Sequence, residues 1–255
     1  MNKILVIALN TYKESIRDKL LYNLLIFALL LIGGSVILST LTVGERSKII
    51  IDLSLASLNL FGVLIAVFVG IGLVSKEIEK KTIYTIIAKP VHRWQFLAGK
   101  YLGLLITLAV NVGLMTVCVY AVQLEGEWTL RLELLQAVWL IYVELMIVTA
   151  VALLCSTFTT STLAAIFTLS LYVIGHFSSS LKEFAKKVGS DSATAVANVL
   201  YYSLPNLDHF NIKGEVVHHI AVSADRVFWS TVYGLAYIAA LLVLAVIIFQ
   251  RRDFK

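Results

Sequence analysis

The sequence predicts an all-α integral membrane protein with six transmembrane helices. Apolar residues make up 59% of the 255 residues, charged residues make up 15%, and the mean hydropathy is +0.89. Soluble domains carry about 25% charged residues, so this composition indicates a chain that lies in a bilayer. A helix that crosses about 30 Å of hydrocarbon needs about 20 apolar residues. We expect the spans at 20–44, 53–75, 101–124, 134–155, 162–181 and 227–250.

The residues before the first span predict an amphipathic helix over 1–19. At 100° per residue one face is apolar, and the other carries Lys3, Lys13 and Arg17. The apolar face consists of Ile4, Leu5, Ala8, Leu9, Tyr12 and Ile16. Such a helix lies along the membrane surface, either as a simple interfacial anchor or as a helix that also contacts a cytoplasmic partner.

The fourth and fifth spans share a stretch, Leu134–Leu181, in which Glu144 is the only charged residue. We place the turn between them at Ser156–Thr162, because hydroxyl side chains can satisfy the backbone groups that a turn frees. A charge inside a span is expensive and usually faces protein or water. Glu144 therefore has two interpretations: a residue of the translocation path or dimer seam, or a structural bond between helices.

The positions of lysine and arginine predict the orientation. With both termini in the cytoplasm, thirteen of the 21 basic residues lie inside, and the short outer loops 44–52 and 125–133 hold three. This is the bias of the positive-inside rule. The remaining basic residues lie in a long outer segment, 182–226, where the rule is weak. The net charge of +5 thus indicates contact with anionic lipid and not with nucleic acid.

The segment 76–100 is the longest charged stretch on the cytoplasmic side. Nothing breaks a helix from Lys76 to Ala88, and Pro90 ends it because a proline pushes the residue before it out of the α region. A second helix is expected to start near His92. Ile83, Ile86 and Ile87 share one face of the first helix, which suits either a protein groove or the lipid headgroups.

The stretch "SKEIEKKTIYTIIAKPVHRWQFLAGKYLG" resembles the first cytoplasmic loop of the permease subunits of ABC-type exporters of the type 2 permease superfamily. The shared features are a glutamate pair, a threonine, an aliphatic stretch, Pro-Val-x-Arg and Phe-Leu-x-Gly-Lys. The amphipathic N-terminus, "STFTTSTLAA", "LPNLDHFNIK" and the basic "QRRDFK" end agree with that family. Among its members, the chain is most similar to small six-span permeases such as those of nitrous-oxide reductase maturation systems.

This resemblance implies that 76–100 contains a coupling helix, which sits in a cleft of a separate ATP-binding subunit. The implied docking residues are Glu77, Glu79, Ile83, Tyr84, Ile86, Ile87, Pro90 and Arg93. It further implies two ATPase copies, a second permease copy in a homodimer or heterodimer, and export by alternating access. The expected location is the bacterial inner membrane.

The sequence predicts no catalytic residue and no cofactor or metal bound by this chain. It has no G-x-x-x-x-G-K-[ST] loop, because "LAGKY" carries Trp94 where the first glycine belongs and Tyr101 where the hydroxyl belongs. ATP and magnesium are therefore expected on the partner subunit. Cys118 and Cys155 fall within predicted spans, which argues against a disulfide or thiolate site. Three histidines of the outer segment are interpreted as loop residues: His209, His218 and His219.

The outer segment 182–226 is too polar to span, and we expect it to carry short helices and to form a lid on the outer surface. One of these helices is predicted after Asp191 or Ser192 and before Pro205. Together the elements form one permease domain, 1–255. Two other functions stay open at this point: a membrane anchor for a soluble partner, and an integral membrane enzyme, for which only His176 joins Glu144 as an ionisable residue in the spans.

Overall fold

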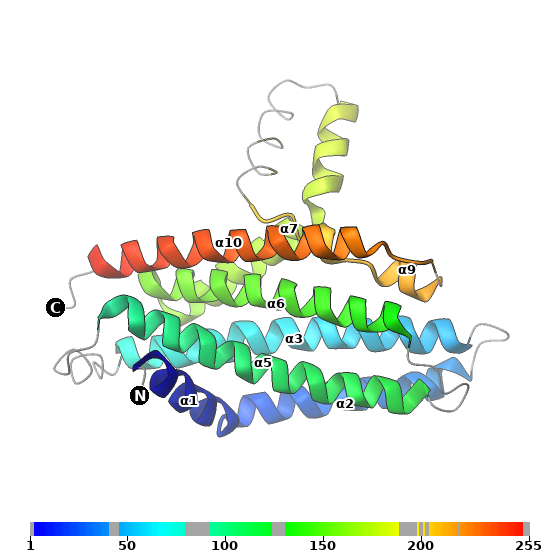
Figure 1. Cartoon of the computed structure of the whole chain (residues 1–255), viewed down its shortest axis with the longest axis horizontal. Coiled ribbons are helices and arrows are strands. Elements are labelled where there is room, and N and C mark those ends of the chain that lie inside the picture. Colours follow the sequence, from blue (N-terminus) through cyan, green and yellow to red (C-terminus); the bar gives the residue numbers. More distant parts are fainter. Residues whose placement is uncertain are drawn as a thin grey trace.

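The computed structural model describes residues 3–40, 46–79, 92–123, 131–188, 198, 201, 204–218 and 220–251. Within these ranges all regular structure is helical (Figure 1). The long helices are α1 (Lys3–Ile16), α2 (Lys19–Ser39), α3 (Arg46–Glu79), α5 (Arg93–Gln123), α6 (Leu132–Phe158), α7 (Ser161–Val188) and α10 (Ala224–Arg251). Two short ones, η1 (Leu207–Phe210) and α9 (Lys213–Val217), precede α10. Six of the helices are long and apolar enough to cross a membrane, which confirms the predicted fold class.

Local chemistry sets the boundaries of these helices. Asp18 lies between the end of α1 at Ile16 and the start of α2. It caps α2, because its carboxylate accepts a hydrogen bond from the main-chain N–H of Leu20 at 3.0 Å. The predicted turn between the fourth and fifth spans is present at Thr159 and Thr160. There the hydroxyl of Thr159 donates to the carbonyl of Cys155 at 2.8 Å, as expected for a turn that must satisfy its own backbone groups.

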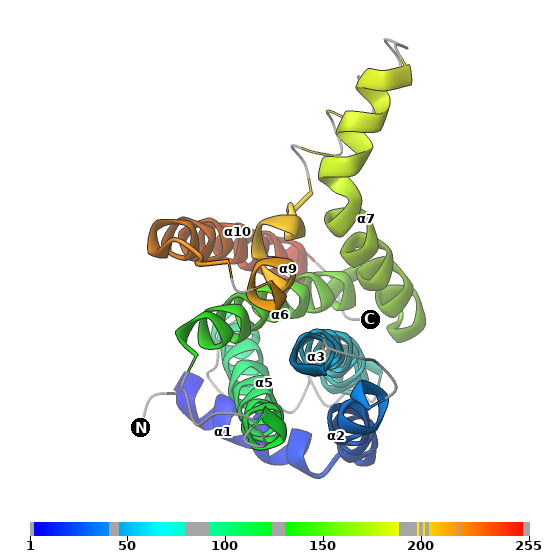
Figure 2. The ribbon, with the colours of Figure 1, turned by 90° about the vertical axis from the view of Figure 1, so that its right-hand side faces the viewer.

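Helix α6 forms the centre of the bundle. It packs against α3, α5, α7 and α10, and residues on nearly all of its faces are buried. The end-on view shows α1, α2, α3 and α5 on one side of α6 and α10 on the other (Figure 2). The helices next to the centre therefore surround it, while many apolar side chains of the outer helices stay exposed for contact with lipid.

The beginning of α1 and the end of α10 lie at the same end of the bundle (Figure 1). The end of α3 and the beginning of α5 lie there as well. These two helix ends flank the segment that the sequence predicts to be cytoplasmic, so we call this end of the bundle the docking end. The outer end, opposite to it, carries α9.

Helix α1 packs tightly against α5, and of its fully buried residues only Ala8 belongs to the predicted apolar face. Gly99 and Gly103 of α5 leave room for it: a Cβ at Gly103 would lie 2.6 Å from the carbonyl oxygen of Ala8, and one at Gly99 would lie 2.7 Å from Ile7. The buried residues of α1 are Ala8, Thr11 and Ser15. Leu5 and Leu9 of the predicted apolar face are 54% and 49% exposed. Small residues and Ile7 thus pack against α5, whereas Leu5 and Leu9 stay on the outside.

Part of the outer segment is inserted among the helices and does not lie on top of them. Residues 205–212 run between α6, α7 and α10, and Phe210 is 0% exposed. Two glycines make this possible, because a Cβ at Gly234 would lie 2.6 Å from Val143 and 3.2 Å from Phe210, and one at Gly175 would lie 2.9 Å from the carbonyl oxygen of Pro205. The surface lid expected from the sequence is therefore, over these residues, a wedge. Most of the predicted helix after Asp191 lies outside the described residues.

Helix α7 follows the bundle for only part of its length. Its first 18 residues, Ser161–Ser178, form the membrane-crossing portion, and the rest turns away from the other helices (Figures 1 and 2). Phe177, next to the end of the membrane-crossing portion, and Phe184, beyond it, are 62% and 65% exposed. The membrane-crossing portion of α7, Ser161–Ser178, is therefore the part that contributes side chains to the interior of the helix bundle.

Candidate functional site

Most of the predicted docking residues fall outside the described part of the chain. These residues are Ile83, Tyr84, Ile86, Ile87 and Pro90. Glu77 and Glu79 lie in the last turn of α3, for which the structure describes the backbone and not the side chains. Arg93 is the first residue of α5, which agrees with the helix start expected near His92.

Arg93 connects the start of α5 to the end of the last helix. Its Nη1 donates hydrogen bonds to the main-chain carbonyls of Phe249 and Gln250 at 2.9 and 3.0 Å. These carbonyls belong to the last turn of α10, where intrahelical partners run out and the helix dipole favours a cation. One turn further along α5, the ring of Phe96 stacks on that of Phe249 at 6.1 Å between centroids. A movement of the segment before Arg93 would thus reach α10 directly.

Lys100, which follows on α5, is also buried at this end, with 2% of its surface exposed. Its ammonium group lies 3.4 Å from the carboxylate of Glu14 on α1. Because Glu14 is 42% exposed, this ion pair is partly solvated and adds little stability on its own. Its position still fixes the register of α1 on α5, next to the Gly99–Gly103 contact.

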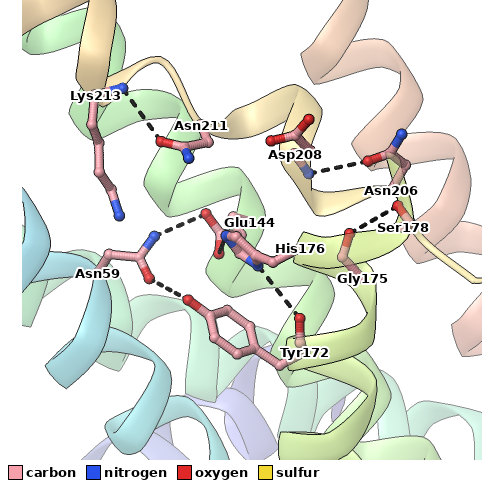
Figure 3. A network of polar contacts seen from close by, with 10 residues as sticks. All are labelled: Asn59, Glu144, Tyr172, Gly175, His176, Ser178, Asn206, Asp208, Asn211 and Lys213. Carbon is pink, nitrogen blue, oxygen red and sulfur yellow. Dashed lines mark hydrogen bonds and ion pairs between the residues drawn. The ribbon is translucent and has the colours of Figure 1, made fainter. Parts of the chain in front are cut away.

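A second candidate site surrounds Glu144, near the middle of α6 (Figure 3). The residue is 0% exposed, so the carboxyl group has no contact with solvent. Asn59 of α3 donates a hydrogen bond from Nδ2 to Glu144 Oε2 at 3.0 Å. His176 of α7 places Nε2 3.5 Å from Oε1, the oxygen that has no hydrogen-bond partner among the described residues. Three helices therefore meet at one carboxyl group.

Tyr172 completes the network from α7. Its hydroxyl donates to Asn59 Oδ1 at 2.8 Å, which fixes the amide so that its NH₂ group faces Glu144. Its ring lies 4.6 Å from the ring of His176, one turn later on the same helix. Tyr142, two residues before Glu144 on α6, donates to the carbonyl of Leu105 at 3.1 Å. Glu144 therefore takes part in contacts between α3, α6 and α7, and its place in a translocation path or dimer seam stays a prediction.

The outer segment adds a positive charge to this site. Lys213, the first residue of α9, extends its side chain toward Asn59 and Glu144 (Figure 3). Burial lowers the pKa of the Lys213 amine, whereas the nearby carboxyl groups of Glu144 and Asp52 act in the opposite direction. The ammonium group is therefore held close to acidic groups in a poorly solvated place. Asp208 of η1 lies within electrostatic range of His176.

Glu144 and His176 stand out in the sequence as ionisable residues within spans. Nothing in the sequence indicates that Asn59, Tyr172 and Lys213 are their neighbours. Asn59 and Tyr172 are polar residues within apolar spans, which is the signal that could have found them. Lys213 lies in a segment expected on the outer surface, and only its insertion brings it here. The described residues hold no group of three or more His, Cys, Asp or Glu side chains placed for a metal ion.

The comparison with known families covers nearly the whole chain. Residues 5–254 match the model of a family described as ABC-2 family transporter protein. No curated protein matches the chain significantly. The match includes both sites described above, and it runs from α1 through the end of α10.

Proposed function

The chain belongs to the ABC-2 family of transporter proteins, and we propose from this premise that it docks a separate ATPase through residues 76–93 and moves its substrate out of the cytoplasm. It is a transmembrane permease subunit of an ABC transporter. Members of this family are non-catalytic membrane subunits, and they pair with an ABC ATPase subunit. The proposal adds the docking segment, the direction and the route of the movement.

The observation that carries the proposed route is the contact of Arg93 with the end of α10. The ATPase would push on the residues between Glu79 and Arg93, and this displaces the end of α3 and the start of α5 together. Helix α10 follows α5 through Arg93 and Phe96, because both residues contact its last turn. Helix α1 follows through the close contact at Gly99 and Gly103. All four helices then respond to one displacement.

The assembly we propose contains two copies of this chain and two ATPase subunits, with both termini of each chain in the cytoplasm. The distribution of basic residues supports this orientation, since it follows the positive-inside rule. Outward transport is supported by the resemblance of residues 75–103 to the loop of exporters. In this arrangement the docking end faces the ATPase and the outer end faces away from the cytoplasm.

Co-purification tests the docking segment. The wild-type chain and the variant Ile83→Asp/Ile86→Asp are each expressed with the ATP-binding protein encoded beside them and purified in detergent. We expect the wild-type chain to retain the ATPase and the variant to fold but lose it, because charges on the apolar face prevent its burial in a cleft. Equal retention by both would show that the ATPase docks elsewhere.

A matched control distinguishes this segment from α1, the other helix that the sequence offers for a cytoplasmic contact. Leu5→Asp/Leu9→Asp places two carboxylates on the exposed side of α1, where both leucines are about half exposed. We expect this variant to keep the ATPase. Loss of the ATPase in the α1 variant alone would assign docking to α1 instead of residues 76–93.

A further inference from the structure

The Glu144 site poses a problem of charge balance inside the membrane domain. A single ionised carboxylate in such a place is costly unless a partner neutralises it. Two neighbours offer this: His176 at 3.5 Å, which is neutral or cationic, and Lys213, which reaches in from α9. The first belongs to a transmembrane helix. The second belongs to α9, directly after the wedge, so the state of Glu144 and the position of α9 depend on each other.

The other charged or titratable groups around the site come from every neighbouring element. Helix α3 contributes Asp52, α7 contributes Tyr172, and η1 contributes Asp208. Asn59 is polar but does not titrate. Of these groups, Asp52 is seven residues nearer to the outer end of α3 than Asn59, about 10 Å along the helix.

We propose that the Glu144–His176 pair is a proton-binding site that controls whether α9 stays packed against α3 and α6. Without the extra proton, the carboxylate of Glu144 is negative and compensates the ammonium group of Lys213. When the pair takes up one proton, it becomes neutral and no longer compensates Lys213. The ammonium group then moves toward Asp52 and water at the outer end, and it takes α9 with it.

One feature of the site supports a proton as its ligand, and a second supports the displacement of α9. Glu144 Oε1 is buried and has no hydrogen-bond partner among the described residues, although an acceptor or donor nitrogen lies 3.5 Å away. A proton placed on this oxygen lies between the two groups. In addition, α9 is short and contains only Lys213–Val217. The chain after it stays attached to α9, because the N–H of Ile220 donates to the carbonyl of Glu215 at 2.8 Å. Such a short element can shift as a unit, and its shift would move or break the ion pair between Glu215 of α9 and Arg226 of α10.

The test measures the position of α9 in the chain alone, so its outcome does not depend on ATPase docking. Spin labels are attached at Ile220→Cys and Leu132→Cys, two exposed positions on the α9 side and at the start of α6. Cys118→Ser and Cys155→Ala remove the native thiols. The protein is reconstituted in lipid nanodiscs, and the distance distribution is measured by double electron–electron resonance between about pH 8 and about pH 5, the range over which histidine changes charge.

We expect one short distance at the upper pH and a second, longer distance that grows as the pH falls. The ratio of the two populations should change by at most about tenfold per pH unit, as the uptake of one proton requires. In Glu144→Gln the longer distance should dominate at every pH, because the site can no longer become negative. In Lys213→Met the distances should not respond to pH, because α9 no longer carries the charge that needs compensation.

The control variant is Asp225→Asn, which removes one negative charge from an exposed residue at the outer end of α10. It should keep the wild-type pH response. An unchanged distance distribution of the wild-type chain over this pH range would overturn the proposal. So would a Lys213→Met variant that responds to pH as the wild type does, and this second result is decisive even if Glu144→Gln fails to fold.

Discussion

Arg93 donates two hydrogen bonds to the last turn of α10, to carbonyl groups 156 and 157 residues away in the sequence. The contact joins Arg93, the last residue of the proposed docking segment, to the end of α10. It combines hydrogen bonds from a charged donor with a cation at a helix C-terminus, and both are favourable. Its position, and not its strength, makes this contact important for the proposed route by which a movement of the ATPase reaches the membrane helices.

Replacing Arg93 should separate ATPase binding from ATPase coupling. In Arg93→Met we expect the partner to remain bound, while the ATP turnover that depends on substrate or permease is lost. Stability should fall by about 1–2 kcal/mol, because hydrogen bonds from a charged group are lost at a partly exposed site. Arg93→Lys keeps the charge and should be intermediate. Parallel measurements of co-purification and ATP turnover check this, and a loss of binding in Arg93→Met would contradict it.

The close contact between α1 and α5 predicts opposite effects of two glycine substitutions in the same helix. Gly103→Ala places a methyl group 2.6 Å from the carbonyl oxygen of Ala8 and should cost about 1–3 kcal/mol. Gly113→Ala has no atom within 4 Å of the new methyl group and should be neutral or stabilising by up to about 1 kcal/mol. Thermal unfolding in detergent measures both. Equal effects would show that α1 does not pack here.

The buried position of Phe210 next to Gly234 predicts that Gly234→Ala loosens the packing of the wedge, residues 205–212. The added methyl group would lie 2.6 Å from Val143 and 3.2 Å from Phe210, so the two cannot keep their places. We expect faster hydrogen exchange over 205–217, while exchange at the docking end stays unchanged. Gly33→Ala, which has nothing within 4 Å of the new methyl group, serves as control and should leave both regions as they are.

The network around Glu144 predicts a ranking of two substitutions. Asn59→Leu removes both the donor to Glu144 and the acceptor of the Tyr172 hydroxyl, so it should cost more than Tyr172→Phe, which removes one hydrogen bond. For the latter we expect about 0.5–1.5 kcal/mol, the range for hydrogen bonds between membrane helices. The free energy of unfolding in mixed micelles measures this ranking, and the reverse order would show that the network is assigned wrongly.

The pKa of Lys213 predicts a pH dependence of stability with a defined sign. Burial lowers this pKa in the folded chain, so the folded state binds fewer protons than the unfolded state at pH values below the ordinary lysine value of about 10.4. Stability should then rise with pH from the lowered pKa toward about 10.4. Lys213→Met lacks this rise, so the difference in unfolding free energy between the two proteins should shift in favour of the wild type as the pH increases. A constant difference would contradict the prediction.

The sequence predicted the six spans, the turn near Thr159 and the helix start near His92, because apolar length and helix-breaking residues are local signals. It did not predict which side of a helix faces the interior. In a bilayer both the core and the lipid are apolar, so the periodicity that marks a buried face in a soluble helix is weak. Helix α1 illustrates this, since its leucines stay exposed while Ala8 and Ser15 are buried.

The neighbours of Glu144 could not be predicted for a different reason. Asn59, His176 and Lys213 are 85, 32 and 69 residues away from it, and no local pattern joins them. They meet because α3 and α7 pack on α6 and because the outer segment enters the bundle. The small residues Gly175 and Gly234, which permit this entry, are visible in the sequence but resemble ordinary glycines of transmembrane helices.

The buried position of Phe210 also determines the order in which the chain can be assembled during biosynthesis. Its side chain rests against α6 and against Gly234 of α10, and α10 leaves the ribosome after the segment that contains Phe210. In the proposed orientation the outer segment is translocated before α10 is inserted, so Phe210 cannot reach its final position until α10 has entered the bilayer. Closure of the wedge is therefore a late step of insertion, and a nascent chain that is halted before α10 exposes an apolar segment to membrane quality control.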